Sequence, residues 1–283
     1  MLFVTMLYEL DRTLWGSKWQ RSFDDYLRHF LDMIKSLDPE IELLVFSDNE
    51  KVQKICSFFP QTTYVYYDRY WFGLNAQRHR IRSAVSNRYS LWSSPEFTQG
   101  EYVYVQLCKF EAVRLALTLR QTEHVAWIDG GYRWPPPTWK LIINQCKEFK
   151  IYGLQNAREH NNEWCILNSP TQHVQGSFFG GHRGVMTWLV QKCLGVVHSL
   201  LSEGRVGNDQ QILSLVQLAH PEYFMLRKSY TIHWMTGLST CNTGSLSKQL
   251  SLQANRIEYN YVIVIFAALY IFIRGQLYLS TVY

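Results

Sequence analysis

The sequence lacks several patterns that mark common classes of protein. Its six cysteines are widely spaced and form no C-x-x-C pair, which argues against a zinc site or a disulfide framework and favours free thiols in a reducing compartment. No lysine-rich block marks a nucleic-acid track, so no nucleic acid is expected as a partner. The first residues, MLFVTMLYELDR, turn acidic too soon for a signal peptide. A cytoplasmic protein is the simplest expectation.

The composition that remains is that of a globular chain. Of the 283 residues, 47% are hydrophobic and 18% are charged, so the chain can build a substantial core in one large domain or two small ones. Aromatic residues reach 15%, which fits wide ligand grooves as well as a core. The net charge of +5 is modest and favours an anionic ligand such as a nucleotide diphosphate.

Strands and helices alternate along the first half of the chain. Apolar or β-branched runs predict strands at 2–8, 41–48, 62–68 and 124–129. Helices are expected after the capping-box pair Ser22 and Asp25, at 50–58 and at 105–120. This alternation predicts an α/β fold in which a mixed, mostly parallel sheet is flanked by helices. Functional groups of such a sheet collect at the carboxyl ends of its strands.

The second half predicts strands at 149–155 and 230–234, a glycine-rich strand and turn at 174–184, and helices at 185–201 and 208–220. We expect one domain over 1–236, a polar linker over 237–257 and a hydrophobic tail over 258–283. The apolar residues of the tail favour membrane insertion, and Arg274 opposes it by a comparable amount. A tail anchor or peripheral membrane contact and a buried hairpin therefore both fit.

Asp129 is the first candidate for a functional residue. It ends the apolar run Val125–Ile128, and Gly130 and Gly131 follow it without side chains, so a bulky ligand can approach the backbone there. A carboxylate at this edge suits a divalent cation that neutralises phosphates. A simple turn beginning at Asp129 explains the same residues.

Other polar residues could join Asp129, and each also has a structural explanation. His233 could add a nitrogen ligand, as Mn²⁺ tolerates, or be a packed histidine. Asp48 ends another strand, where it lines the same edge or caps a helix. Asp209, with Gln210 beside it, opens a helix; it fits either a general base or a helix cap.

A glycine-rich and an arginine-rich segment complete the candidates. The glycines of GSFFGGHRG let a sugar or a neighbouring backbone come close, although the segment is neither a Walker loop nor G-x-G-x-x-G. Four arginines lie close together in RHRIRSAVSNR: Arg78, Arg80, Arg82 and Arg88. They could clamp a diphosphate or form a solvated face.

The order of several segments resembles the HtrL/YibB family of glycosyltransferases in cell-surface glycan assembly. The segments are FVTMLYELDR, SFDDYLRHF, VFSD, VQLCKFEAVRLAL, VAWIDGGYR, VQGSFFGG and NDQQILSLV, and the resemblance covers about residues 1–236. It implies a fold like glycosyltransferase A, a nucleotide-sugar donor, a glycan acceptor, and Mn²⁺ or Mg²⁺ on the donor diphosphate.

The resemblance also implies roles for single residues. Asp129 takes the place of the metal-binding acidic motif, which is usually Asp-x-Asp; here the third position is Gly131. His233 resembles a late metal-binding histidine. The residues implied in donor binding are Thr5, Asp48, Lys109, Asp129, Gly180, Gly181 and Gln210. Asp209 is the expected base if the reaction inverts the anomeric centre.

The sequence is therefore compatible with three functions. The leading hypothesis is a glycosyltransferase that moves a hexose or pentose from a nucleotide sugar to a glycan hydroxyl. The alternative is a carbohydrate-binding protein of the same fold without catalysis, which the missing second carboxylate and the many aromatic residues allow. The third, a membrane-associated structural protein, depends on the tail over 258–283 alone.

Overall fold

The computed structural model describes residues 1–11, 22–88, 94–130, 150–155, 162–168 and 174–228. These residues belong to one compact unit, Met1–Ile232, and the description below is of that unit. His233, the strand expected at 230–234, the linker over 237–257 and the tail over 258–283 lie outside the described residues. Their expected roles stay predictions.

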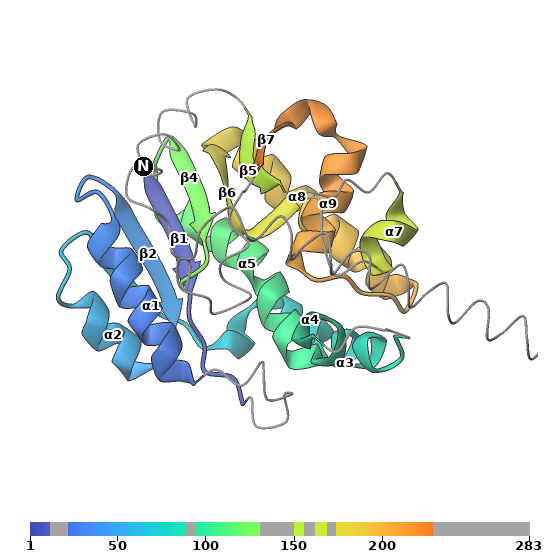
Figure 1. Cartoon of the computed structure of the whole chain (residues 1–283), viewed down its shortest axis with the longest axis horizontal. Coiled ribbons are helices and arrows are strands. Elements are labelled where there is room, and N and C mark those ends of the chain that lie inside the picture. Colours follow the sequence, from blue (N-terminus) through green and yellow to red (C-terminus); the bar gives the residue numbers. More distant parts are fainter. Residues whose placement is uncertain (12–21, 89–93, 131–149, 156–161, 169–173, 229–283) are drawn as a thin grey trace, which may run out of the picture. The chain divides into compact units, whose positions relative to one another are not determined.

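A seven-stranded sheet forms the centre of the unit, in the order β3-β2-β1-β4-β6-β5-β7 (Figure 1). β1 pairs in parallel with β2 and β4, β2 pairs in parallel with β3, and β5 with β7, whereas β6 runs antiparallel to β4 and β5. The strands are β1 Leu2–Met6, β2 Glu42–Ser47, β3 Thr62–Tyr66, β4 His124–Ile128, β5 Ile151–Gln155, β6 Val174–His182 and β7 Phe224–Lys228. The predicted fold class, a mixed and mostly parallel α/β sheet flanked by helices, is confirmed.

Helices cover both faces of the sheet. On one face, α1 and α2 pack against alternate strand residues such as Phe3 and Val45. On the other face, α3, α5, α8 and α9 pack against Val4 and Trp127. The helices are α1 Phe23–Ser36, α2 Glu50–Cys56, α3 Arg78–Ser86, α4 Pro95–Thr98, α5 Gly100–Leu119, α7 Glu163–Asn168, α8 Arg183–Ser202 and α9 Asp209–Ala219. Because side chains alternate between faces along a strand, each strand contributes to both cores.

Local sequence signals explain several element boundaries. Ser22 and Asp25 form the predicted capping box at the start of α1. Asn208 caps α9 in a second capping box, with Gln211 as its partner. At the other side of the sheet, α2 is capped by Asn49, and not by Asp48. Neither of the two candidate aspartates, Asp48 and Asp209, is therefore the cap of a helix.

Some elements differ from the sequence-based expectations. The glycine-rich segment expected as a strand and turn is one continuous strand, β6, because its glycines pair along β4. α5 begins at Gly100, five residues before the expected start, because Val103 and Tyr104 are buried along the same helix before the apolar pattern that begins at Val105. The strand β7 and the helices α3, α4 and α7 were not predicted from the sequence.

One described helix, α8, is long and apolar enough to cross a membrane by length and composition. The core helices of other folds pass the same test, and Val185, Leu189 and Cys193 of α8 are buried in the core.

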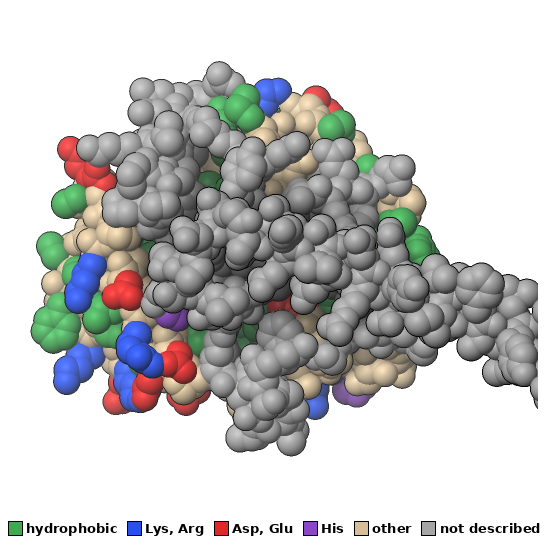
Figure 2. Space-filling model, viewed as in Figure 1, with side chains coloured by type: hydrophobic (Ala, Val, Ile, Leu, Met, Phe, Trp, Pro, Cys, Tyr) green, Lys and Arg blue, Asp and Glu red, His purple; other side chains and the backbone are tan. Residues whose placement is uncertain are grey.

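Ion pairs link neighbouring helices at the surface: Lys51 of α2 contacts Asp24 of α1 at 2.8 Å. Figure 2 shows acidic and basic side chains intermixed over these two helices.

Candidate functional site

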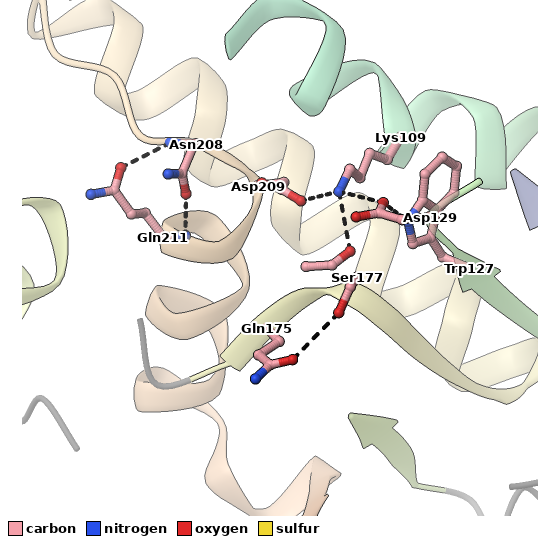
Figure 3. A network of polar contacts seen from close by, with 9 residues as sticks. Lys109, Trp127, Asp129, Gln175, Ser177, Asn208, Asp209 and Gln211 are labelled. Carbon is pink, nitrogen blue, oxygen red and sulfur yellow. Dashed lines mark hydrogen bonds and ion pairs between the residues drawn. The ribbon is translucent and has the colours of Figure 1, made fainter. Parts of the chain in front are cut away.

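Lys109 organises a cluster of polar groups at the carboxyl end of β4 (Figure 3). Its Nζ donates to Asp129 Oδ1 at 3.0 Å, to the carbonyl oxygen of Gly176 at 3.1 Å, and to Asp209 Oδ2. A lysine ammonium has three N–H donors, and these three acceptors use all of them. We call Lys109, Trp127, Asp129, Gly176 and Asp209 the Lys109 cluster.

The fold brings the Lys109 cluster together from four elements. Lys109 comes from α5, Asp129 follows β4, Gly176 lies in β6 and Asp209 opens α9. Gly176 must lack a side chain, because a Cβ built there would lie 2.0 Å from Asp209 Oδ2. Since Asn208 caps α9, the carboxylate of Asp209 is available to Lys109.

Asp129 is the member of the cluster that reaches solvent. Its side chain is 40% exposed, whereas those of Lys109 and Asp209 are 6% and 1% exposed. Trp127 Nε1 donates to Asp129 Oδ1 at 2.9 Å, and the Asp129 backbone N–H donates to the carbonyl oxygen of Ser177 at 2.9 Å. One lysine and two ionised aspartates carry a net charge of −1. The exposed carboxylate of Asp129 presents that charge to a ligand.

Burial and charge act in opposite directions within the cluster. Burial alone would lower the pKa of Lys109, but the charges of Asp129 and Asp209, with their hydrogen bonds, raise its pKa above the ordinary value. Burial raises the pKa of Asp209, and the Asp129 charge adds to this, while Lys109 opposes it. Lys109 therefore stays charged at neutral pH and holds both carboxylates.

Sequence reasoning missed three residues beside the cluster: Tyr102 and Gln106 of α5 and Glu96 of α4. Tyr102, Gln106 and Lys109 lie on one face of α5 at i, i+4 and i+7. Buried Glu96 of α4 is close enough to interact with the cluster: burial raises its pKa, the Asp209 charge adds to the rise, and Lys109 lowers it. The polar spacing within the apolar segment YVYVQLCKF was the available signal for Tyr102 and Gln106.

Three buried side-chain oxygens without hydrogen-bond partners belong to the cluster or to the elements around it. Among the described residues they include Asp209 Oδ1, Gln106 Oε1 and Thr5 Oγ1. Thr5, in β1, is fully buried, and its Oγ1 lies 3.3 Å from the position that a Cβ on Gly130 would take. Unsatisfied buried polar atoms are uncommon in proteins and mark places where a water or ligand group can bind.

Of the other predicted donor-binding residues, Gln210 lies beside the cluster, and Asp48 lies at the end of β2, with β1 between it and β4. Gln210 follows Asp209, and its Cγ lies 3.0 Å from the position of a Cβ built on Gly176. Asp48 follows β2 and is partly buried; burial raises its pKa and Arg69 opposes the rise. Because β1, β2 and β4 are parallel, Thr5, Asp48 and Asp129 share one edge of the sheet.

Gly180 and Gly181 lie away from that edge. They pair with Ala126 and Val125 at the beginning of β4, because β6 runs antiparallel to β4 and its last residues return to the opposite edge. A Cβ on Gly180 would lie 2.5 Å from Ala126 Cβ, so the glycine allows close packing of the two strands. The structure does not bring either glycine to Asp129; Gly176 is the glycine of β6 that lies in the cluster.

The described residues do not by themselves fit a divalent-metal site. No group of three or more His, Cys, Asp or Glu side chains able to hold a metal occurs within the described ranges. Oδ1 of Asp129 already accepts from Lys109 and Trp127, so within the described part of the chain only Oδ2 remains to contact a ligand. His233, the expected second ligand, lies outside the described residues. The expectation of Mn²⁺ or Mg²⁺ stays a prediction.

The comparisons with known proteins find likeness to solved structures and to nothing else. No family model and no curated protein matches the chain. Among solved structures, the chain is similar to mouse xyloside xylosyltransferase 1 in its apo form, with 10% sequence identity and a TM-score of 0.45. The match covers 80% of this chain and 84% of that chain. A likeness of this degree carries no argument about function, and membership of the HtrL/YibB family stays a prediction.

Proposed function

We propose that the protein is a glycosyltransferase that takes a hexose or pentose from a nucleotide sugar and transfers it to a glycan hydroxyl. The observation that carries the proposal is the exposed carboxylate of Asp129 at the carboxyl end of β4, held in place by Lys109 and Trp127. Ligands of open α/β sheets bind at this edge. The ordered sequence segments that resemble the HtrL/YibB family support the same activity.

In this proposal, Lys109 and Asp209 position Asp129. Lys109 fixes one oxygen of Asp129 and so turns the other toward the ligand. Preorganised charge of this kind contributes most to catalysis when it does not have to reorient during the reaction. A base role for Asp209 stays a prediction; its burial and its ion pair with Lys109 favour a positioning role. A hydroxyl of the bound sugar is a suitable hydrogen-bond donor for the free oxygen of Asp129.

A carbohydrate-binding protein without catalysis is the second candidate. It is favoured by the single accessible carboxylate of the cluster and by the full use of the three Lys109 N–H donors, which leaves that ammonium unable to bind a phosphate directly. Such a protein would bind glycans or nucleotide sugars without consuming them.

Release of nucleotide from a panel of nucleotide sugars tests the proposal. The full chain is incubated with pentose and hexose donors, a mixture of glycan acceptors, and either Mn²⁺ or EDTA. We expect Asp129→Asn to lower turnover about a hundredfold or more, as the loss of a preorganised charged group does. Asp24→Asn, at an exposed surface carboxylate, should leave turnover unchanged. Binding without turnover in the parent protein would instead support the non-catalytic candidate.

A further inference from the structure

Arg88 is a partly buried cation that has no anionic partner among the described residues. It follows α3, and its guanidinium carbon lies 4.5 Å from the centre of the Phe97 ring in α4. Its Nη2 is buried and forms no hydrogen bond. Two other partly buried arginines of the described residues have acceptors: Arg78 binds Glu101, and Arg120 binds Glu42.

The charge of Arg88 is therefore desolvated without compensation. Burial lowers the pKa of Arg88 to about 10, and no carboxylate opposes this effect. Buried charges in proteins are normally paired, because an unpaired charge costs folding free energy. An anion that binds from the solvent-facing side of the guanidinium would supply the missing partner.

The surroundings of Arg88 connect it to the proposed active site. Phe97, which it contacts, is the neighbour of Glu96, and Glu96 interacts electrostatically with Lys109 and Asp209. α5 begins directly after α4, and no side chain caps its first turn. The start of a long helix carries a partial positive charge and free N–H groups that favour anions. Arg88 and the start of α5 thus both favour an anion, and both adjoin α4, whose Glu96 interacts with the Lys109 cluster.

We propose that Arg88 binds a phosphate group of the donor, so that it supplies the positive charge that Lys109 does not. This assignment rests on the proposed function, since it takes the anion to be the diphosphate of a nucleotide sugar. An N–H on the solvent-facing side of the guanidinium can donate a charge-assisted hydrogen bond to a phosphate oxygen. Lys109 cannot take this role in the described arrangement, because its three N–H groups are bound to Asp129, Asp209 and Gly176.

A purely structural role for Arg88 makes the opposite prediction about stability. If its stacking on Phe97 stabilised the fold, Arg88→Met would lower the melting temperature of the ligand-free protein. If Arg88 serves a ligand, Arg88→Met removes an uncompensated charge, and the melting temperature should stay the same or rise. If Arg88 serves a ligand, Arg88→Met should therefore weaken anion binding without lowering the melting temperature of the ligand-free protein.

Inorganic pyrophosphate is the probe, because it presents a diphosphate without base or sugar. Its dissociation constant is measured calorimetrically for the full chain and for Arg88→Met, Arg88→Lys and Arg28→Met; Arg28 is an exposed arginine of α1. We expect Arg88→Met to weaken binding about 10- to 100-fold, the usual worth of hydrogen bonds to a charged group. Arg88→Lys should weaken binding less, and Arg28→Met should leave it unchanged.

Equal pyrophosphate affinity in Arg88→Met and the parent protein would overturn the assignment, and so would absent binding in the parent. A lower melting temperature of ligand-free Arg88→Met would assign a structural role and overturn it as well. Failure of the proposed function has a different signature: pyrophosphate binding would depend on Arg88 while no nucleotide sugar is turned over.

Discussion

Replacing Lys109 with methionine is the most informative perturbation of the Lys109 cluster. The substitution keeps most of the side-chain volume but leaves the carboxylate of Asp209, 1% exposed, buried without its cation. Removal of one partner from a buried ion pair costs about 3–5 kcal/mol. For a folded unit of this size, about 2–4 °C of melting temperature corresponds to each kcal/mol, so Lys109→Met should lower the melting temperature by roughly 6–20 °C.

Urea unfolding followed by circular dichroism measures this effect, with two comparisons. Lys51→Met breaks the exposed pair with Asp24, whose side chains are 63% and 68% exposed, and should cost at most about 1 kcal/mol. The double change Lys109→Met with Asp209→Leu replaces the pair by apolar side chains and should recover most of the loss. If Lys109→Met costs no more than Lys51→Met, Lys109 does not hold the cluster together.

Two further substitutions test neighbouring groups. Burial raises the pKa of Glu96 in the folded protein. At pH values above this raised pKa, ionisation of the carboxyl destabilises the fold to its full extent. Below the ordinary pKa of about 4.3 the carboxyl is protonated in both the folded and the unfolded protein, so it has no such effect. Glu96→Gln should therefore raise the melting temperature at pH 8 and leave it unchanged near pH 4; an equal shift at both pH values would show that Glu96 does not titrate as described. Gly176→Ala places a Cβ against Asp209 and should cost about 1–3 kcal/mol in chemical unfolding. The control Gly195→Ala, where a Cβ meets nothing within 4 Å in α8, should stabilise by about 0.5–1 kcal/mol; the same sign for both alanines would refute the packing argument.

Sequence reasoning recovered most of the sheet because its strands are apolar runs with clear ends. Strands such as β2 and β4 stop where the apolar run reaches Asp48 or Asp129. Helices without such a pattern were missed: α3 carries the exposed Arg80 and Arg82, and only Ile81, Ala84 and Val85 are buried.

The site was predicted in part. Asp129, Lys109 and Asp209 were each named from the sequence, and the structure brings them into direct contact. The contact of Gly176 with them was not predicted, because only the antiparallel direction of β6 decides that Gly176 lies at the carboxyl end of β4 and Gly180 farther from it. Donor binding by Gly180 and Gly181 stays a prediction. Strand direction depends on long-range pairing, which residue spacing alone does not encode. The orphaned buried oxygens and the unpaired Arg88 likewise depend on packing.

A crystal structure of the full chain with a bound nucleoside diphosphate tests the central claim most directly. The account predicts the diphosphate at the carboxyl edge of the sheet, with the free oxygen of Asp129 contacting the ligand or a cation bound to it, and with the Lys109 contacts to Asp129 and Asp209 unchanged. A nucleotide bound elsewhere, with Asp129 facing only water, would contradict it.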